Sequence, residues 1–405
     1  MSDSPQATEI IDLGELVTTL LAERDEHDDE EWLRKQLAEL DESRRVQLEP
    51  LLDDALDEFD LPEEMDVVVT RTGDVFNESY DADWPSDFDG WSGRSRPERS
   101  EDEEGFLRRF TWRFGGKVRT WELEVPGPLF KYYTNRHRTR SFGVYISDPF
   151  DEPFISSLAN RIREFGSDVG LNENERINAA VRFVQSLEYT PDDVTTGQIE
   201  YPKYPIETLV HDGGDCEDTS ILLGAILREL GCDVAPIVLP NHQHMILGVS
   251  PTTNIDGSHF EHEGTKYYTV EATGHGWDIG ELPRQYSGAS GEVYPVGGDP
   301  ILVHDWTAQP RSDGKLDLMI NLANFGDVCA ESLAVQLEFE DESGSIVGRT
   351  QVTRDQTILP SQSETFRAQI SLPDDTLLRG KCLLTIGHRV HDASTSDWQK
   401  GHGEK

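Results

Sequence analysis

Hydrophobic residues recur every three or four positions along several stretches of the chain, which is the spacing of an amphipathic helix. This pattern predicts two helices within residues 8–58 and two more at residues 154–166 and 173–188. A loop that contains glycine and proline follows, from residue 189 to residue 205. With 405 residues, the chain is long enough for two or three domains with a sizeable buried core.

Elsewhere, hydrophobic and polar residues alternate, which is the pattern of a half-buried β-strand. Residues 106–114 and 118–125 alternate on either side of a glycine turn and predict a β-hairpin. Short alternating segments also recur at regular spacing beyond residue 301, and this rhythm predicts a β-sandwich of immunoglobulin-like type. These segments are residues 316–323, 333–339, 346–352, 364–370 and 382–386.

The two patterns together predict an α+β fold. Residues 81–104 are dominated by Asp, Ser, Gly, Arg and Glu, so we interpret this segment as a solvated loop or linker. We expect amphipathic helices at 1–60, an acidic loop or linker at 61–105, a β-hairpin region packing on the core at 106–150, the core itself at 151–300, the immunoglobulin-like sandwich at 301–395 and a tail at 396–405.

The net charge of the chain limits the classes of partner that it can bind. It has 78 Asp and Glu against 36 Lys and Arg, which gives a formal net charge of −42. Nucleic acid and anionic membranes would repel such a protein, so we expect no nucleic-acid partner and no membrane partner. An acidic surface suits molar salt, where repulsion between charges is screened, and we predict a halophilic protein whose activity needs high salt.

Three further features bear on location. No stretch approaches the roughly 20 apolar residues of a membrane helix, and the N-terminus lacks the basic and apolar segments of a signal peptide. Four cysteines without dense spacing do not make a secreted disulfide scaffold. We therefore expect a cytoplasmic protein, with Cys232 buried as a small apolar residue, and with Cys329 and Cys382 as free thiols in preference to a pair.

One segment combines a turn, a helix start and a thiol. Two glycines precede Asp215-Cys216-Glu217-Asp218, and a long apolar run that ends at a glycine follows. Asp215 can cap this helix with Asp218 three residues on, which puts Cys216 in the first helical turn. The helix dipole and the unpaired N–H groups there favour a thiolate, so we predict a lowered pKa and a nucleophilic role for Cys216.

A nucleophilic thiol needs a base, and the base needs a third group that orients it. Residues 234–239 predict a strand, His244 begins a second strand, and Glu271 lies at the far end of a third. In an antiparallel meander the head of one strand and the tail of the next lie side by side, so His244 and Glu271 should meet. His242 is the alternative base, but the apolar strand begins directly after His244. Glu271 as a plain solvated carboxylate is the alternative to an orienting role.

These residues resemble the transglutaminase-like superfamily, whose core has a papain-like cysteine triad, and in particular its prokaryotic and archaeal members. The resemblance covers roughly residues 170–285. It rests on Gly214–Asp218 at the helix start, the helix end at 227–231, the His244 strand, residues 268–273 in place of the family's aspartate-proline-threonine segment, and the lead-in at 201–209.

The resemblance implies a transglutaminase-like core of helices packed on an antiparallel sheet. It also implies a thiol-dependent acyl-transfer enzyme of peptidase or amidase type, acting on a peptide or protein amide. Cys216 would be the nucleophile that carries the acyl group, His244 the general base and acid, and Glu271 the orienting carboxylate. Glu271 stands where the family more often has Asp, and Met follows His244 where many members have Ala and Trp, which leaves the substrate class open.

Acyl transfer also needs two donors for the developing oxyanion. The Cys216 backbone N–H is one candidate. Tyr189 resembles the aromatic donor of this superfamily, with Tyr201 and Tyr204 as alternatives on the same loop. A hypothesis of a different class is a non-catalytic scaffold, in which the C-terminal β-sandwich is a candidate surface for a protein partner.

Two other clusters have simpler explanations. The region rich in histidine around Cys216 lacks Cys-x-x-Cys and His-x-x-x-His pairs, and no phosphate-binding glycine motif occurs, so we expect neither metal nor cofactor. A dense basic cluster either forms a subsite for an acidic group or pairs with neighbouring carboxylates, and we favour pairing. This cluster contains Lys131, Arg136, His137, Arg138 and Arg140.

Overall fold

A computed structural model describes residues 66–68, 90–94, 105–139, 141–191, 201–253, 255–311, 314–373 and 376–400. The helices predicted within residues 8–58 lie outside these described residues, and the predicted domain boundaries stay a prediction. The chain divides into two compact units, Met1–Asp66 with Arg113–Thr120, and Val67–Trp112 with Trp121–Lys405. Every element of the candidate site lies in the second unit.

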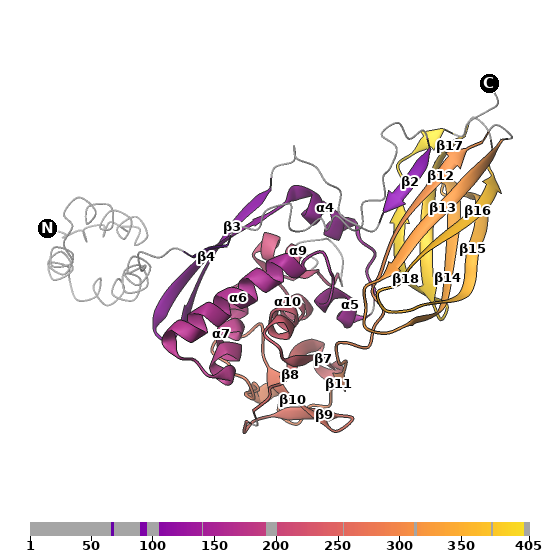
Figure 1. Ribbon diagram of the computed structural model, residues 1–405. Helices are drawn as coiled ribbons and strands as arrows, with labels where there is room; N and C mark the ends of the chain where they lie inside the picture. Colours follow the sequence, from indigo (N-terminus) through magenta and orange to yellow (C-terminus); the bar gives the residue numbers. More distant parts are fainter. Residues whose placement is uncertain are drawn as a thin grey trace, which may run out of the picture. The chain divides into compact units, whose positions relative to one another are not determined.

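The helices predicted at residues 154–166 and 173–188 are present (Figure 1). The first extends beyond its predicted range at both ends, and the second ends at Gln185, before the end of its range. Asn172 caps the second of them, because its side chain accepts the N–H of Glu175 at 3.0 Å while the Glu175 carboxylate accepts the N–H of Asn172 at 2.8 Å. The described helices are α4 (Gly127–Asn135), α5 (Phe142–Ile146), α6 (Glu152–Val169), α7 (Glu173–Gln185), α9 (Pro205–His211), α10 (Cys216–Glu229) and the short 3₁₀ turns η3 (Pro240–His242) and η4 (Arg284–Tyr286).

The predicted β-hairpin consists of β3 (Phe106–Phe114) and β4 (Lys117–Val125), joined by two glycines with positive φ. These strands form a sheet in the order β1-β4-β3 with β1 (Asp66–Val68). A second sheet has the order β11-β7-β8-β10-β9. Its strands are β7 (Asp233–Leu239), β8 (His244–Ser250), β9 (His259–His262), β10 (Thr265–Val270) and β11 (Glu292–Val293).

Helix α10 is the centre of the core that carries this second sheet. It contacts α6 and α7 as well as β7 and β8, so it has neighbours on opposite sides (Figure 1). A helix in that position must be apolar all round, and its run from Ile221 to Leu227 is almost wholly buried. Each buried Leu or Ile contributes about 1.5–3 kcal/mol. The apolar run that follows the cysteine motif therefore fixes this helix firmly in the core.

Two further antiparallel sheets share one hydrophobic core and form a β-sandwich. The strands predicted in the last part of the chain all appear in it, and each of them is longer than expected. One sheet has the order β16-β13-β12-β2, and the other has the order β15-β14-β17-β18, with β19 paired to β17. The strands are β2 (Trp91–Arg94), β12 (Leu302–Pro310), β13 (Lys315–Asn324), β14 (Ala330–Asp341), β15 (Ile346–Ile358), β16 (Ser363–Ser371), β17 (Leu377–Ile386), β18 (Arg389–Thr395) and β19 (Gln399–Lys400).

The interpretation of residues 81–104 as a solvated loop is wrong at β2. This strand pairs with β12, and Trp91 is only 1% exposed. The Trp91 indole N–H donates to the Leu378 carbonyl at 3.0 Å, and its ring meets Phe339 edge to face. A single buried tryptophan among Ser, Gly and Arg gives no alternating pattern, so its burial depends on a partner strand more than two hundred residues away.

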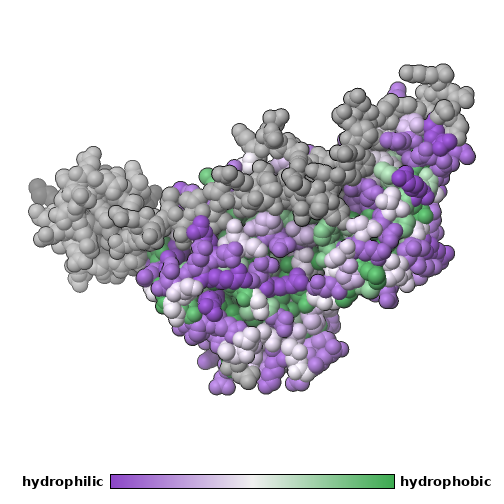
Figure 2. All heavy atoms as spheres, viewed as in Figure 1, coloured by the Kyte–Doolittle hydropathy of each residue, from purple (hydrophilic) through white to green (hydrophobic). Residues whose placement is uncertain are grey.

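The described part of the molecule is thus an α+β structure of helices and antiparallel sheets. Hydrophilic side chains cover much of the face displayed in Figure 2. Among the described helices, none combines the length and the apolar character that crossing a membrane requires.

Candidate active site

Cys216 is the first residue of α10, where the sequence predicts the helix to begin. The Asp218 carboxylate accepts the backbone N–H of Asp215 at 3.2 Å, and the Thr219 hydroxyl donates to the Asp215 carbonyl at 2.7 Å. The first backbone N–H groups of a helix have no partner within the helix, so the contact from Asp218 to the Asp215 N–H marks where α10 begins. The thiol is therefore held at a defined point beside β8.

The sheet brings His244 and Glu271 together. β8 and β10 are antiparallel, with Val270 opposite Leu247, so continuing the register puts Glu271 two positions from His244 on the same face. The His244 Nε2 atom lies 2.9 Å from Glu271 Oε2. The expected meeting of strand head and strand tail is therefore present.

The surroundings of Glu271 hold it as a charged acceptor. Its side chain is buried, and its second oxygen accepts the N–H and the hydroxyl of Thr273 at 2.9 and 2.5 Å. Burial raises the pKa of Glu271, but the hydrogen bonds from His244 and Thr273 outweigh it and leave this pKa below its ordinary value. Because Nε2 of His244 faces this carboxylate, Nδ1 is the ring nitrogen left for another partner.

The two candidate histidines have different environments. His242 ends the 3₁₀ turn η3, is exposed, and touches Tyr286 edge to face. His244 is largely buried, and its ring stacks on Tyr286 with centroids 4.6 Å apart. Among the described residues, it is His244 and not His242 that forms a hydrogen bond to Glu271. His244, the base favoured from the sequence, is thus the histidine with a carboxylate partner and a stacked tyrosine.

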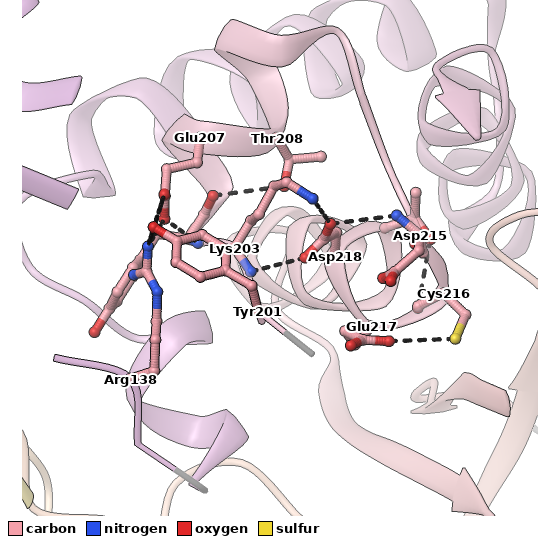
Figure 3. Close-up of polar contacts among 11 residues, drawn as sticks. Arg138, Tyr201, Lys203, Glu207, Thr208, Asp215, Cys216, Glu217 and Asp218 are labelled. Carbon is pink, nitrogen blue, oxygen red and sulfur yellow. Dashed lines mark hydrogen bonds and ion pairs between the residues drawn. The ribbon is translucent and has the colours of Figure 1, made fainter. Parts of the chain in front are cut away.

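The sulfur of Cys216 lies next to the backbone that carries His244. This sulfur is close enough to the backbone N–H of Met245, the residue after His244, for that N–H to lower the pKa of the thiol. The thiol itself donates to Glu217 Oε2 at 3.4 Å (Figure 3). The nucleophile candidate therefore has a carboxylate on one side and the head of β8 on the other.

The prediction of a lowered pKa for Cys216 is wrong. Burial raises the pKa of this thiol, the neighbouring charges of Glu217 and Asp215 raise it further, and the Met245 amide only partly opposes them. The helix dipole acts at the same position, but its effect is worth only about 0.3–1 kcal/mol near a surface. With its pKa raised, this thiol holds its proton more tightly than an ordinary cysteine does.

We expect iodoacetamide to alkylate Cys216 slowly at neutral pH and faster as the pH rises, because a raised pKa leaves little thiolate. Glu217→Gln removes the adjacent charge and should accelerate alkylation about tenfold at a given pH, which corresponds to about one pKa unit. Peptide mass spectrometry over a pH series measures each thiol separately. Burial raises the pKa of Cys232 to about 11, and this thiol is the internal control, because its alkylation should not respond to Glu217→Gln. Rapid alkylation of native Cys216 in mildly acidic buffer would contradict this account.

Of the tyrosines near the thiol, one was expected from the sequence and one was not. Tyr189 lies in β5 (Glu188–Tyr189), which pairs in parallel with β6 (Gly213–Gly214) just before Cys216. Burial raises the pKa of Tyr189, and the nearby Cys216 raises it further. Tyr286, which sequence reasoning missed, stacks on His244 and also interacts electrostatically with Cys216. It ends the 3₁₀ turn η4, three residues after Pro283, and no spacing or periodicity marks it.

The two alternative tyrosines have other partners. The Tyr201 hydroxyl donates to Glu207 at 2.9 Å, and Tyr204 is fully buried against the rings of Tyr133 and Tyr145. Neither environment leaves a hydroxyl that faces the thiol. Tyr189 and Tyr286 are therefore the hydroxyl groups that remain candidates beside Cys216.

Two arginines of the basic cluster pair with carboxylates, as favoured from the sequence. Arg136 forms an almost wholly buried ion pair with Asp148, and Arg138 pairs with Glu207 at 2.7 Å. Arg140 lies outside the described residues. A cavity of about 760 Å³ borders this cluster, but the residues that line it include neither Cys216 nor His244. The cluster thus has a structural explanation within the described residues.

The other sulfur and metal candidates add little. Within the described part of the chain, one group of potential metal ligands has its atoms within 4.8 Å of one another, namely Asp215, Cys216 and Glu217. These are three consecutive side chains at one helix start, and we assign no ion to them. Cys232 and Cys382 are buried, Cys329 is partly exposed, and all three are free thiols.

A second histidine, His304, takes part in a series of hydrogen bonds inside the β-sandwich. His304 Nδ1 is 3.2 Å from Asp392, and its Nε2 is 2.7 Å from the hydroxyl of Ser394, which also accepts the Trp306 N–H. Serine, histidine and aspartate in this order are the groups of a hydrolase triad. All three side chains are buried, however, so no substrate reaches the hydroxyl, and we interpret this series of hydrogen bonds as a satisfied polar network in the core.

Comparison with known proteins does not assign this chain to a family. No family model and no curated protein matches the chain. One similar solved structure is DesR, a β-glucosidase from Streptomyces venezuelae in complex with D-glucose, at 12% identity over 26% of this chain and 16% of that chain, with a TM-score of 0.16. A β-glucuronidase of glycoside hydrolase family 2 is 9% identical over 40% of this chain and 20% of that chain, with a TM-score of 0.19. Red sea bream transglutaminase is 11% identical over 75% of this chain and 62% of that chain, with a TM-score of 0.20. At such TM-scores these likenesses carry no argument, and the chain spans less than two thirds of each of these proteins.

Proposed function

We propose that this chain is a thiol-dependent acyl-transfer enzyme of peptidase or amidase type with a transglutaminase-like core. Cys216 acts as nucleophile, His244 as general base and acid, and Glu271 as the carboxylate that orients His244. The observation that carries the proposal is the hydrogen bond of 2.9 Å between His244 and Glu271, made directly beside a cysteine at a helix start. The motif around Cys216 and its resemblance to the superfamily supply the reaction class.

The proposed reaction has two halves. His244 Nδ1 accepts the Cys216 proton as the sulfur attacks the carbonyl carbon of an amide, and the carbonyl oxygen becomes an oxyanion. His244 then gives that proton to the leaving amine, and the C–N bond breaks to leave an acyl-Cys216 thioester. In the second half, His244 deprotonates a water that attacks the thioester, which releases the acid and restores the thiol.

The raised pKa of Cys216 fits a particular version of this reaction. A thiol with a raised pKa transfers its proton to His244 during the attack and not before it, as a serine nucleophile does. Glu271 supports this step because its charge stabilises the imidazolium that forms. For the oxyanion, the Cys216 N–H and the hydroxyl of Tyr189 are the proposed donors, and Tyr286 is the alternative that the geometry adds.

The test is a panel of peptide and amide substrates, assayed in molar KCl because the net charge of −42 favours high salt. We expect release of a free amine and a free acid in equal amounts from at least one substrate class. Absence of turnover across the panel by protein with an intact cooperative unfolding transition would contradict the proposal.

Glu271→Gln should lower kcat by about two to four orders of magnitude, with a smaller change in KM. The amide keeps the size of the side chain but loses the charge that favours Nε2–H of His244 and stabilises the imidazolium. Steady-state kinetics of the variant measure this effect, and thermal unfolding serves as its control. A kcat within about threefold of the native value would remove Glu271 from the proposed triad.

One observation favours a second candidate function, a non-catalytic scaffold whose β-sandwich binds a protein partner. The thiol has a raised pKa and donates to Glu217, which is how an inert cysteine would also behave. The substrate panel separates the two candidates, since a scaffold turns over no amide under any salt condition. The cytoplasmic location and the salt requirement stay predictions from the sequence.

A further inference from the structure

A fully buried ion pair lies directly behind the candidate nucleophile. Lys203 and Asp218 have side chains that are 0% exposed, and the Lys203 ammonium pairs with Asp218 Oδ2. The same carboxylate accepts the backbone N–H of Lys203 at 2.7 Å and the backbone N–H of Asp215 at 3.2 Å. Figure 3 shows how these contacts join the segment before α9 to the first turn of α10. Asp218 thus ties two stretches of backbone together next to Cys216.

A second set of contacts holds the Lys203 segment from its other side. The Glu207 carboxylate accepts the backbone N–H of Tyr204 at 2.9 Å and the Tyr201 hydroxyl at 2.9 Å. Arg138 donates to both oxygens of Glu207, at 2.7 and 2.9 Å. Lys203 therefore lies between two anchored neighbours and has little freedom to move.

The cluster also touches the strand that leads to the oxyanion candidate. A Cβ atom on Gly214 would lie 2.5 Å from the Cβ of Asp218, so only glycine allows this close packing. Gly214 belongs to β6 and is the register partner of Tyr189 in β5. A shift of Asp218 would therefore move both the helix start that carries Cys216 and the strand that carries Tyr189.

Stability alone does not require this pair. Removing two charges from water carries a desolvation penalty, and apolar residues of similar volume often stabilise a fold equally well or better. What an ion pair adds is direction, because the ammonium and the two N–H groups must all point at the carboxylate oxygens. The Lys203–Asp218 pair is suited to setting a position and not to adding stability.

We propose that Lys203 and Asp218 are positioning residues, which fix the first turn of α10 so that the Cys216 sulfur and backbone N–H meet the substrate carbonyl in line with His244. This inference rests on the proposed function. A misplacement of about 1 Å in an active site lowers the rate by about 10²-fold, so loss of the pair should affect kcat far more than KM.

The test compares two charge-neutral double variants in the full chain. Lys203→Met with Asp218→Asn removes the pair, while Arg136→Met with Asp148→Asn removes an equally buried pair at another place. Asp148 lies beside Arg228, which is in the last turn of α10, so the control pair is near the same helix but at its opposite end. Each variant is examined by thermal unfolding, steady-state kinetics and the rate of Cys216 alkylation by iodoacetamide.

We expect the Lys203/Asp218 variant to lose at least about tenfold in kcat and to alkylate Cys216 at a rate that differs at least about threefold from the native rate. The Arg136/Asp148 variant should keep both within about twofold, even where its unfolding temperature falls. Equal behaviour of the two variants in kcat and in alkylation would overturn the inference.

Two further arms keep this test decisive. If the Lys203/Asp218 variant does not fold, Asp218→Glu keeps the charge and lengthens the link by one methylene, and the same loss of kcat is expected with folding intact. Alkylation needs no substrate, so it reports on the inference even if no amide is turned over. A protein that hydrolyses amides through Cys216 but shows no response to Asp218→Glu retains the proposed function and loses the positioning role.

Discussion

Cys216→Ala should abolish amide turnover, with a fall in kcat of about 10⁴- to 10⁶-fold. The sulfur is the atom that the reaction needs for its acyl intermediate, and the methyl group that replaces it can form no such bond. The variant should fold normally, because the contact that defines the helix start is made by Asp218 and not by the thiol. Release of free amine from the best substrate of the panel measures the effect.

Cys232→Ala is the matched control for this variant. Cys232 is also a free thiol, buried to 6% exposure just beyond the other end of α10, and it should keep kcat within about twofold. Equal residual turnover in Cys216→Ala and the native protein would exclude the thiol mechanism. Equal losses in both cysteine variants would show an effect on the fold and not on the chemistry.

His244→Ala should lower kcat by about 10³- to 10⁵-fold, while His242→Ala should retain it within about threefold. His244 has the hydrogen bond to Glu271 and the stacking contact with Tyr286, whereas His242 is exposed on η3 and touches only the edge of that ring. Steady-state kinetics of both variants in molar KCl, with circular dichroism as a control of folding, provide the comparison.

The pair of histidine variants is informative in both directions. Loss of activity confined to His242→Ala would show that His242, and not His244, is the base. Loss in neither variant would mean that the proton of Cys216 goes to another group, and Glu217, whose carboxylate accepts the thiol at 3.4 Å, would then be the candidate.

The position of Cys216 and the meeting of His244 with Glu271 are predictable from the sequence for simple reasons. Glycine, aspartate and an apolar run are local signals for a helix start, and they read the same way whatever surrounds them. The first two strands are joined by a tight turn and pair as a hairpin, and the third can then return antiparallel beside the second, which brings the tail of the third to the head of the second. Strand β9, which the sequence did not predict, lies in the longer connection between them.

The pKa of Cys216 depends on facts that local signals do not contain. Its direction is decided by burial and by the rotamer that brings the Glu217 carboxylate to 3.4 Å from the sulfur. A helix start and an adjacent acid have opposite effects on a thiolate, and their balance follows from desolvation in the folded chain. A prediction from the helix start alone therefore gives the wrong direction for the pKa of Cys216.

Contacts between distant segments were also beyond prediction. Lys203 and Asp218 are separated by a helix and a turn, and nothing in their spacing indicates that they form a buried pair. Trp91 likewise enters the β-sandwich through a strand whose partner lies far along the chain. Such pairings are chosen by tertiary packing, which overrides the polar character of the surrounding sequence.

The most direct test of the central claim is to trap the acyl intermediate. The protein is mixed with an excess of an activated ester or slow amide substrate, quenched in acid, digested and examined by mass spectrometry. The account predicts a mass increase equal to the acyl group on the peptide that contains Cys216, absent in Cys216→Ala and persisting longer in His244→Ala once formed. Turnover of the same substrate with no acyl group on Cys216 at any time point, or with the acyl group on a different residue, would contradict it.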